Sequence, residues 1–549
     1  RGSFMIKITF RDIREMYSEF SLTVREILAK VDFAAKDRVV ACRVNRVQRS
    51  LSWKISMDSF VEFITTDSVE GIEVYNRTLS FMLTSAASRK CDIRLHLRQS
   101  MNYSYYYDSP DGPISDEQRK IILTEMRRMV KDGTALIREE HSLDEARAIM
   151  YSQGYHDKEQ LLRWTNNDPV VLYRCEGIYD FFGGALADTA SIVPTFDLHT
   201  YKGGLFISGP SLVNPTKTTE LRASAKTLKL FQDYAQWLDN LSVGTMDRIH
   251  SIVAHGHSRD LIMVSEALHT KILSKIAEHI ESRPEVRLLC LAGPSSSGKT
   301  TSSRRLRVQL LTSGINSATL ELDNYFVDRD KTPVDADGKF DFESLDALDI
   351  PLINEHLRAL IAGEEVDIPK FDFKTGTRTK GYKLKLAPKQ LLVIEGIHGL
   401  NDKLSESVAF DNKYRIFICP LTGTNLDMHN RVGTTDIRLL RRLLRDYRTR
   451  GNSPEATLLQ WPSVVRGSHR HIFPYQDNAD TLFNTALAYE LPVLKGYVFP
   501  LLKSVSEESP AYGEAQRLLA MLQYIPVIPS DDVPNLSIMR EFIGGSCFE

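Results

Sequence analysis

The most regular alternation of apolar and polar segments lies in the second half of the chain, from residue 285 to about residue 500. Apolar runs of strand length, such as 286–292 and 391–394, alternate there with stretches of helical spacing, such as 300–312. This order is typical of a parallel sheet covered by helices. We therefore expect one α/β domain over residues 285–500.

The beginning of the chain shows a pattern of short strands. Over residues 5–70, β-like runs at 6–10 and 38–44 flank one helical segment at 23–31. A few short strands around a single helix are typical of a small β-grasp-like module, and we expect that fold here.

The next region, residues 71–215, mixes helical and strand patterns. Helices are expected at 115–131 and 142–152. Ser142 and Glu145 have the spacing of a capping box, in which each residue satisfies a backbone N–H group of the other at the start of a helix. The pattern predicts an α+β domain.

Two segments remain. Residues 216–284 carry long helical patterns without strong strand signals and are expected to connect the two halves. The tail, residues 501–549, has helical patterns at 513–524 and 538–545 and should pack back onto one of the domains. The expected fold class is α/β, with a C-terminal parallel-sheet domain preceded by β-grasp and α+β domains.

Composition narrows the function classes. A chain of 549 residues with 42% hydrophobic and 26% charged residues is typical of several globular domains. A net charge of −2 argues against a dominant nucleic-acid or membrane-surface role. The six cysteines form no C-x-x-C pair, and no apolar run reaches spanning length. We expect a cytoplasmic protein without a zinc site, a disulfide framework or a membrane segment.

Residues 293–300 read GPSSSGKT, which has the G-x-x-x-x-G-K-[ST] spacing of a phosphate-binding loop. Such a loop turns backbone N–H groups toward phosphate oxygens at the start of a helix. Lys299 is expected to reach the β- and γ-phosphates, and the hydroxyl of Thr300 to bind Mg²⁺. The expected nucleotide-binding residues are Gly293, Pro294, Ser295, Ser296, Ser297, Gly298, Lys299, Thr300 and Thr301.

Two acidic residues follow predicted strands and are candidates for catalysis. Asp323 comes after the strand 318–322, at the sheet edge where ligands bind, and can act as a general base; a turn or helix-capping role is the alternative. Glu395 ends the apolar strand 391–394 and can hold Mg²⁺ with Thr300; the alternative is an exposed carboxylate at a strand end.

Six arginines are concentrated between Asp436 and Gly451. Helical spacing places Arg438, Arg441, Arg442 and Arg445 near one face of a helix, with leucines on the opposite face. Arginine suits two-pronged phosphate contacts, so we expect a closing lid that also excludes water. A solvated charged face is the alternative.

From about residue 286 to 500 the chain resembles the uridine kinase/phosphoribulokinase family of P-loop kinases. The resemblance rests on GPSSSGKT, LDNYF at 322–326, the block 340–349, PKFDF at 369–373, IEG at 394–396 and DIRLLRRLLRD at 436–446. It implies Asp323 as catalytic base, with Lys299 and Arg441 also catalytic, and Thr300 with Glu395 at Mg²⁺. The substrate-binding residues that it implies are Tyr325, Phe342, Glu343, Phe371, Phe373, Arg378, Arg438 and Arg442. For the aromatic residues core packing is the alternative, and for Arg378 a place in a surface loop.

Three positions depart from the uridine kinase pattern. Glu343 stands where an aspartate for the ribose hydroxyls is usual, Gly376 where a base-reading histidine is usual, and Ala456 near an expected pocket glutamine. Without the histidine and the glutamine, the site lacks hydrogen bonds that distinguish one base from another. The resemblance therefore implies phosphoryl transfer more firmly than it implies uridine as the acceptor.

Residues 5–210 resemble the amino-terminal region of threonyl-tRNA synthetases, which consists of a TGS-like β-grasp module and a second additional domain that edits mischarged tRNA. The matching segments are 73–86, 105–108, 142–148 and 175–184. The four positions of the editing site hold residues that cannot bind a metal or serve as acid or base, namely Arg77, Phe81, Phe182 and Leu186. An editing reaction is therefore not expected.

The leading hypothesis is an ATP- and Mg²⁺-dependent kinase that phosphorylates a hydroxyl of a nucleoside such as uridine. One alternative is a kinase of the same fold acting on another polyol or sugar-like acceptor. A second alternative is a regulatory ATPase that responds to RNA or a nucleotide, with the synthetase-like half as the binding module. The expected partner is a small-molecule acceptor; RNA contact by the first half and homo-oligomerisation are left open.

Overall fold

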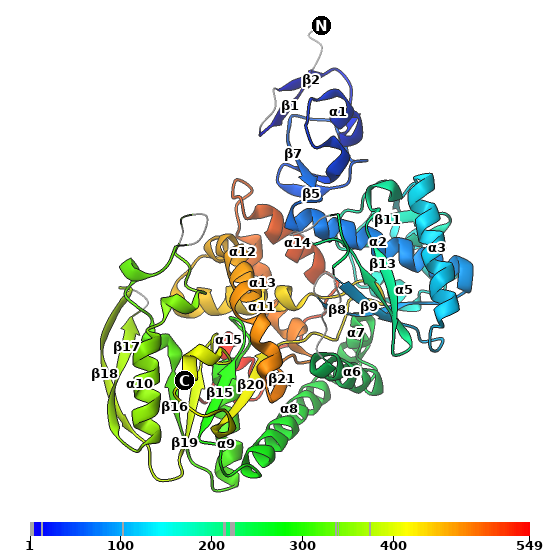
Figure 1. The fold of residues 1–549 in the computed structure, drawn as a ribbon. Helices are drawn as coiled ribbons and strands as arrows, with labels where there is room; N and C mark the ends of the chain where they lie inside the picture. Colours follow the sequence, from blue (N-terminus) through cyan, green and yellow to red (C-terminus); the bar gives the residue numbers. More distant parts are fainter. Residues whose placement is uncertain are drawn as a thin grey trace.

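The structure is a computed structural model, and it describes residues 5–11, 15–101, 104–211, 216–219, 225–334, 338, 340–372 and 375–548. Figure 1 shows a small module at the amino-terminal end, a second domain below it, and a larger α/β domain that holds the C-terminal end. Measured against the thickness of a bilayer, every described helix is too short or too polar to span it.

The first module is a five-stranded sheet crossed by one helix. Its strand order is β2-β1-β7-β4-β5, and β1 runs parallel to β7. The helix predicted at 23–31 is confirmed, and Thr23 and Glu26 cap it reciprocally. The elements are β1 (Ile6–Phe10), β2 (Met16–Ser18), β3 (Leu22–Thr23), α1 (Val24–Lys30), β4 (Val39–Val44), β5 (Val47–Arg49), β6 (Lys54–Ile55) and β7 (Ser59–Thr65).

The second domain is α+β, as the pattern predicts. It contains the sheets β10-β11-β12 and β13-β14-β9-β8, and the capping box of Ser142 and Glu145 is present. Its elements are α2 (Val69–Cys91), β8 (His96–Met101), β9 (Ser104–Asp108), α3 (Asp116–Asp132), β10 (Ile137–His141), α4 (Leu143–Ser152), α5 (His156–Leu162), β11 (Val170–Cys175), β12 (Ile178–Asp180), β13 (Asp197–Tyr201) and β14 (Gly204–Ser208).

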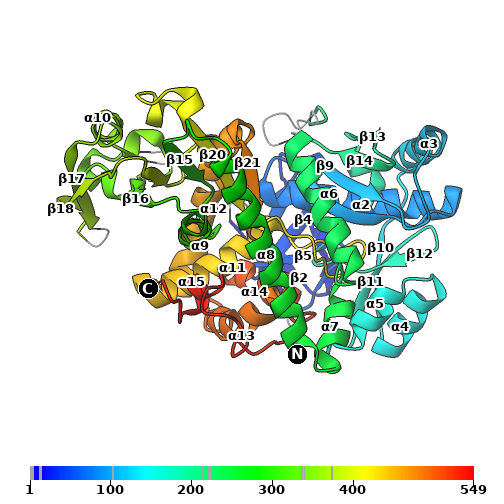
Figure 2. The ribbon, with the colours of Figure 1, turned by 90° about the horizontal axis from the view of Figure 1, so that it is seen from below.

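Three helices connect the halves, and they confirm the helical pattern of the connector. They are α6 (Ala225–Asn240), α7 (Met246–Ala254) and α8 (Ser258–Glu281). Figure 2 shows α8 lying between the α/β domain and the amino-terminal half. Arg305 on the first helix of the α/β domain donates to Glu266 of α8 at 3.0 Å, and both side chains are buried. The connector is thus a packed part of the molecule.

The C-terminal domain contains a five-stranded parallel sheet in the order β16-β19-β15-β20-β21. Every residue of β15, β19 and β20 is buried, as expected for strands covered by helices on both faces. The strands are β15 (Leu288–Ala292), β16 (Ser317–Glu321), β19 (Leu391–Glu395), β20 (Lys413–Cys419) and β21 (Thr481–Asn484), with the separate hairpin β17 (Glu365–Asp372) and β18 (Thr377–Lys385).

Seven described helices accompany this sheet: α9 (Lys299–Thr312), α10 (Ile350–Ile361), α11 (Thr434–Arg445), α12 (Pro454–His471), α13 (Glu490–Lys503), α14 (Tyr512–Leu522) and α15 (Arg540–Ile543). Helix α11 is central, because it packs against α12, α13 and α15. The tail packs back as expected, but onto two domains: α14 contacts both α13 and strand β5 of the first module.

A buried ionic network joins the two halves. The ammonium group of Lys158 on α5 lies 2.8 Å from Asp180 and 2.6 Å from Asp427, and His429 lies 2.6 Å from Asp180. All four side chains are at most 4% exposed. Burial alone would raise the pKa of Asp180, yet Lys158 and His429 hold it below its usual value. Asp427 belongs to the segment between β20 and α11, so the network ties this segment to the second domain.

Replacing Lys158 by methionine should destabilise the protein by about 3–5 kcal/mol, because the buried carboxylates of Asp180 and Asp427 then lose the ammonium group that they share. Urea unfolding followed by tryptophan fluorescence measures the loss. The matched control is Lys120→Met, which breaks the exposed pair with Asp116 and should leave the free energy of unfolding nearly unchanged. Equal losses in the two variants would contradict this role for Lys158.

Acid should weaken the packing of α8 through His269, which is 1% exposed and whose pKa burial lowers to about 4. Because an unfolded histidine titrates near 6.5, the unfolded chain binds the proton first. The stabilisation is complete above pH 6.5 and is lost as the pH falls toward 4, by about 2 kcal/mol at pH 5.

His269→Gln removes this titration. Its unfolding free energy should therefore fall less than that of the wild type between pH 7.5 and pH 5, as measured by urea unfolding at the two pH values. If the free energy of unfolding falls equally in the variant and the wild type between the two pH values, groups other than His269 cause the acid sensitivity.

Candidate functional site

The strand ends of the parallel sheet bring the main candidate residues to one edge. In the register, Glu395 at the end of β19 lies beside Leu291 of β15 and Glu321 of β16. The phosphate-binding loop begins two residues after Leu291, and Asp323 lies two residues after Glu321. Loop, acid and candidate base thus meet at the carboxyl edge, where open α/β sheets bind their ligands.

Both glycines of the loop are required by geometry. A side chain at Gly293 would place its Cβ 2.0 Å from the carbonyl oxygen of Ile418. Gly298 caps α9 in the left-handed region, at φ +84°, which favours glycine. These two constraints hold the loop in the conformation that opens N–H groups at the start of α9.

The loop has donors that fit phosphate. Among the described residues, the hydroxyl groups of Ser296 and Ser297 are buried and have no hydrogen-bond partner. The ammonium of Lys299 donates to the carbonyl of Pro294 at 3.3 Å. Burial lowers the pKa of Lys299, while Glu395 and Asp323 act to raise it. Buried, unsatisfied donors beside a lysine are what an incoming polyphosphate would satisfy.

Thr300 and Glu395 form a pair suited to Mg²⁺. The hydroxyl of Thr300 donates to the carboxylate of Glu395 at 2.6 Å. Burial raises the pKa of Glu395 to about 7, while Thr300 and Lys299 oppose that shift. A hydroxyl and a carboxylate are oxygen ligands of the kind that Mg²⁺ takes in nucleotide sites. The residues present therefore fit this ion.

Asp323 occupies the position of an accessible base. It lies in a 3₁₀ turn after β16, and its side chain is exposed. Its charge acts to raise the pKa of both Lys299 and Glu395, which agrees with its place beside them at the same edge of the sheet. Exposure at this edge would let an acceptor hydroxyl approach it.

The arginines of α11 pack against the phosphate-binding loop. Arg438 and Arg441 are at most 1% exposed, so the alternative of a solvated charged face does not describe them, and the closing lid stays a prediction. Arg438 donates to the carbonyl of Ser295 at 3.0 Å, and Arg441 to that of Ser296 at 3.4 Å. A loop that turns its N–H groups toward an anion turns its carbonyls away, and these arginines satisfy the carbonyls from behind.

Arg441 is also held by a buried ion pair. Its guanidinium donates to both carboxylate oxygens of Glu490 on α13 and to the carbonyl of Thr485. Thr485 in turn donates to the carbonyl of Ser297 at 2.6 Å. Arg441 therefore positions the loop from the protein interior, and neither Thr485 nor Glu490 was singled out from the sequence.

Arg442 and Arg445 reach the loop at its more open side. Each donates to the hydroxyl of Ser295, at 3.0 and 3.5 Å respectively. Their side chains are 11% and 17% exposed, and both pair with Asp446. Of the arginine face, these two are the ones placed to meet a phosphate.

Glu343 faces the α11 arginines from the acceptor side. One of its carboxylate oxygens is buried with no hydrogen-bond partner among the described residues. Burial raises its pKa, and the charges of Arg442, Arg438 and Lys299 hold that rise back. The backbone of α12 comes close to it at Gly467, where an added Cβ would lie 2.4 Å from the Cβ of Glu343. An unsatisfied acceptor here fits a ligand hydroxyl.

The predicted aromatic lining is only partly at the site. Tyr325 is fully buried and bonds His356 at 2.8 Å, and Phe371 packs in the same core, so the core-packing alternative describes both. Phe342 is 40% exposed. Phe373 lies outside the described residues.

Arg378 anchors a hairpin instead of pointing freely into the site. Its guanidinium contacts Asp349 at 3.0 Å and the carbonyl of Phe326 at 3.1 Å. Gly376, two residues earlier, has φ +73°, and an added Cβ would lie 2.7 Å from Arg329. The positive φ and the nearby Arg329 side chain both favour glycine at this turn.

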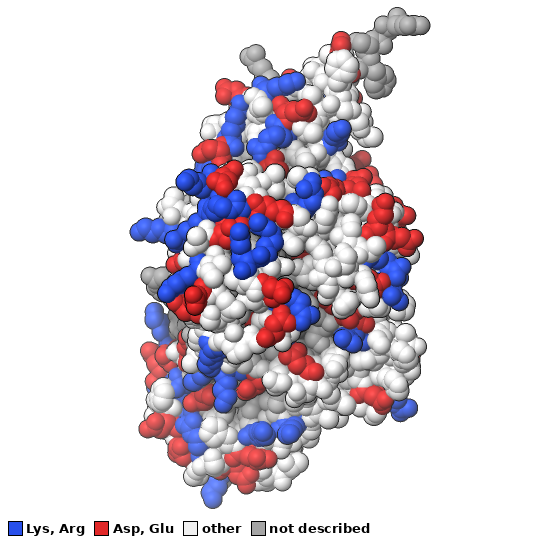
Figure 3. Space-filling model, turned by 90° about the vertical axis from the view of Figure 1, so that its right-hand side faces the viewer, with Lys and Arg blue, Asp and Glu red and all other residues white. Residues whose placement is uncertain are grey.

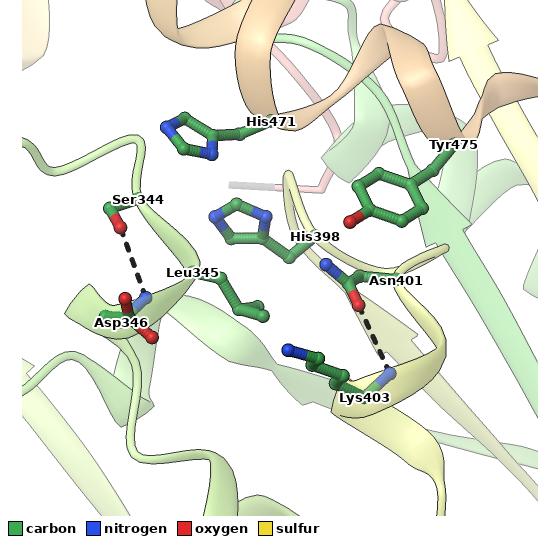
Figure 4. Close-up of a pocket in the computed structure, with 8 residues that line it drawn as sticks. All are labelled: Ser344, Leu345, Asp346, His398, Asn401, Lys403, His471 and Tyr475. Carbon is green, nitrogen blue, oxygen red and sulfur yellow. Dashed lines mark hydrogen bonds between the residues drawn. The ribbon is translucent and has the colours of Figure 1, made fainter.

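A polar cavity of about 200 Å³ adjoins Glu343 through the neighbouring Ser344. Figure 4 shows His398 projecting among side chains from three segments of the domain. His398 is 2% exposed, neither ring nitrogen has a hydrogen-bond partner among the described residues, and burial lowers its pKa to about 4. The lining residues are Ser344, Leu345, Asp346, His398, Asn401, Lys403, His471 and Tyr475.

One carboxylate at the site comes from the tail. Glu541 on α15 accepts from the backbone N–H of Thr301 at 3.2 Å and from its hydroxyl at 2.8 Å. No local pattern could reveal this contact, because the two residues are 240 positions apart.

The four positions that the resemblance to synthetases singles out are occupied by packed or hydrogen-bonded side chains. Phe81 and Leu186 are fully buried, and Phe81 meets Phe182 with ring centroids 5.3 Å apart. Arg77 donates to the carbonyl of Ala185 at 2.7 Å. Within the described ranges, no group of three or more His, Cys, Asp or Glu side chains is placed to hold a metal ion.

Comparison with known proteins agrees with this geometry. Residues 288–490 match the Phosphoribulokinase / Uridine kinase family. A uridine kinase of Deinococcus deserti is 32% identical over 179 residues, which are 33% of this chain and 77% of that protein. A uridine kinase of Chloroflexus aggregans is 31% identical over 198 residues, 36% of this chain and 85% of that protein.

A solved D-glycerate 3-kinase from Cryptococcus neoformans aligns with 48% of this chain and 89% of its own, at 13% identity and a TM-score of 0.23, and adds nothing to the assignment. The matched segment contains the loop, Asp323, Glu395 and the α11 arginines, and is the domain built on the parallel sheet. Through residues 288–490, this chain belongs to the phosphoribulokinase/uridine kinase family.

Proposed function

We propose that the C-terminal domain is a Mg²⁺-dependent kinase that transfers the γ-phosphoryl group of ATP to a hydroxyl of a nucleoside, with uridine as the first acceptor to test. One observation carries the proposal. Lys299, the Thr300–Glu395 pair and the exposed Asp323 lie together at the carboxyl edge of the sheet. A phosphate cradle, a metal pair and a base are the parts that phosphoryl transfer needs.

In the proposed reaction, an oxygen of the acceptor bonds to the γ-phosphorus while the bond from that phosphorus to the β-phosphate oxygen breaks, releasing ADP. Asp323 accepts the proton of the attacking hydroxyl. Lys299 and the N–H groups at the start of α9 hold the β- and γ-phosphates. Mg²⁺, when held by Thr300 and Glu395, would neutralise charge on those phosphates.

The remaining groups position the reactants. Arg442 and Arg445 contact Ser295 at the more open side and are placed to meet phosphate oxygens. The unpartnered carboxylate oxygen of Glu343 would accept a hydrogen bond from a hydroxyl of the acceptor sugar. Such contacts hold the attacking hydroxyl in line, which supplies much of the catalysis of phosphoryl transfer.

A polyol or sugar-like acceptor is the second candidate. The turn at Gly376 has no side chain that could contact a base, and Tyr325 and Phe371 are buried in the core. The cavity beside Glu343 is lined mainly by polar groups of both charges. These observations favour recognition of hydroxyl groups over stacking of a base.

For the amino-terminal half, we propose a TGS-like module followed by an editing-like domain without editing activity. The strand order of the first sheet and its crossing helix support the former. The packed side chains at Phe81, Phe182 and Leu186 support the absence of editing activity in the second domain. Figure 3 shows Lys and Arg interspersed with Asp and Glu on the face of this half, a distribution less suited to RNA than a broad basic field.

The acceptor is tested by ADP release from ATP and Mg²⁺ with uridine, cytidine, D-ribose or ribitol added singly. Uridine should raise the rate of ADP release by roughly 100-fold over ATP alone. An oriented hydroxyl, with Asp323 as its general base, then takes the place of water as the attacking group. A response only to ribose or ribitol would favour the second candidate. Stimulation by RNA with none of these acceptors active would instead favour a regulatory ATPase.

Asp323→Asn should lower the rate of transfer by about 10²–10⁴, because the amide cannot accept the proton. Its affinity for ATP, measured by calorimetry, should change little, because the loop is intact. Asp330→Asn serves as the control, since Asp330 is an exposed carboxylate a few residues later in the chain. Full activity in the Asp323 variant would remove it from the role of base.

A further inference from the structure

The last part of the tail, residues 525–548, returns to the phosphate-binding loop and is anchored there. Figures 1 and 2 both place the C-terminal end on the α/β domain near α15. Ile538 and Phe542 are fully buried, and Arg448, just after α11, donates to the carbonyl of Phe542 at 2.8 Å. Ser537 contacts Tyr489 at 3.0 Å. The tail is therefore part of the packed domain.

Glu541 uses donors that belong to the nucleotide site. Its carboxylate accepts from both the N–H and the hydroxyl of Thr301, in the first turn of α9. The first N–H groups of a helix have no partner within the helix and attract anions. In phosphate-binding loops these groups hold the α- and β-phosphates. The carboxylate thus stands where a phosphate of the nucleotide would be bound.

The Glu541 carboxylate and a nucleotide phosphate exclude each other at Thr301, because both are negatively charged. Glu541 acts on the pKa of Lys299 and of Glu395, raising both, so it lies among the charges of the site. Two negative charges in contact at the surface of a protein repel each other. A phosphate on Thr301 would therefore meet direct repulsion unless the carboxylate left.

An apolar contact holds the tail against the same loop. A Cβ added at Gly298 would lie 2.6 Å from a methyl group of Ile538. Ile538 thus packs directly on the glycine that begins α9, beside the donors taken by Glu541. The tail contacts the loop through both a charge and a buried side chain, so its position does not depend on the charge alone.

We propose that the tail is a built-in competitor of the nucleotide: the Glu541 carboxylate occupies a phosphate position on Thr301 and must leave before ATP or ADP binds fully. The inference rests on the proposed function, because it assumes that the loop binds a nucleotide. Ile538 and Phe542 anchor the segment on both sides, so Glu541 leaves through a local opening of the turn that carries it while the rest of the tail stays docked. When the tail occupies Thr301 in most molecules, only the remaining open fraction can bind nucleotide. The apparent dissociation constant then equals the intrinsic one divided by that open fraction.

The test compares nucleotide binding by the wild type, Glu541→Gln and Glu541→Ala, using a fluorescent ADP analogue and calorimetry with unlabelled ADP. Both variants should bind about tenfold more tightly, as expected when a competitor occupying about nine tenths of the sites is removed. The matched control is Asp531→Asn, which removes an exposed carboxylate of the same segment and should bind like the wild type. Unchanged or weaker binding by both Glu541 variants would overturn the proposal.

Hydrogen exchange provides a second readout in the unmodified protein. Saturating ADP should raise the exchange of amides around Glu541 while leaving those of α14 unchanged, because only the contact with Thr301 is displaced. Protection that stays the same or increases with ADP would show that tail and nucleotide bind together, and would overturn the proposal.

Failure of this inference can be told apart from failure of the proposed function. Lys299→Ala in the wild-type and Glu541→Gln backgrounds should abolish binding, which locates the measured nucleotide on the loop. Equal binding by the wild type and the Glu541 variants overturns the inference alone. Binding by none of them overturns the proposed function and this inference with it. Tighter binding in the variants without transfer to any acceptor sustains the inference and removes the kinase proposal.

Discussion

The carbonyl groups of the phosphate-binding loop impose the constraint on which the rest of the domain depends. A loop that directs its N–H groups toward a phosphate leaves its carbonyls facing the protein, where each needs a donor. Arg438, Arg441 and Thr485 supply those donors. Burying Arg441 is tolerated because Glu490 pairs with it. The loop is thus held in its anion-binding conformation by a buried cation, Arg441, and its counter-ion, Glu490, on the side that faces the protein.

This support couples the kinase domain to the amino-terminal half. Helix α11 carries the arginines, and the segment before it contains Asp427, which pairs with Lys158 of the second domain. Leu97 of β8 adds a backbone hydrogen bond to Met428 at 2.8 Å. A shift of the second domain would therefore act on α11 and, through it, on the loop. The amino-terminal half is thus connected to the phosphate-binding loop through contiguous packed and hydrogen-bonded contacts.

The two sides of the site are built differently. On the nucleotide side, Arg438 and Arg441 are buried and hydrogen-bonded to the loop, and the tail carboxylate of Glu541 accepts from the donors of Thr301. On the acceptor side, Asp323 is exposed and Glu343 keeps an unpartnered oxygen. The nucleotide side is thus built from buried groups that hold the loop, whereas the side of Asp323 and Glu343 keeps polar groups open to a ligand.

The sequence by itself determined the alternation of strands and helices, the loop, and the places of Asp323 and Glu395, because strand periodicity and strand ends are local properties. It also placed four arginines on one face of α11, but not what covers that face. Burial of Arg438 and Arg441, the core positions of Tyr325 and Phe371, and the contact of Glu541 with Thr301 depend on segments far apart in the chain. Only tertiary packing decides them, because the same side chain can face solvent, a carbonyl or a phosphate without any change in its local pattern.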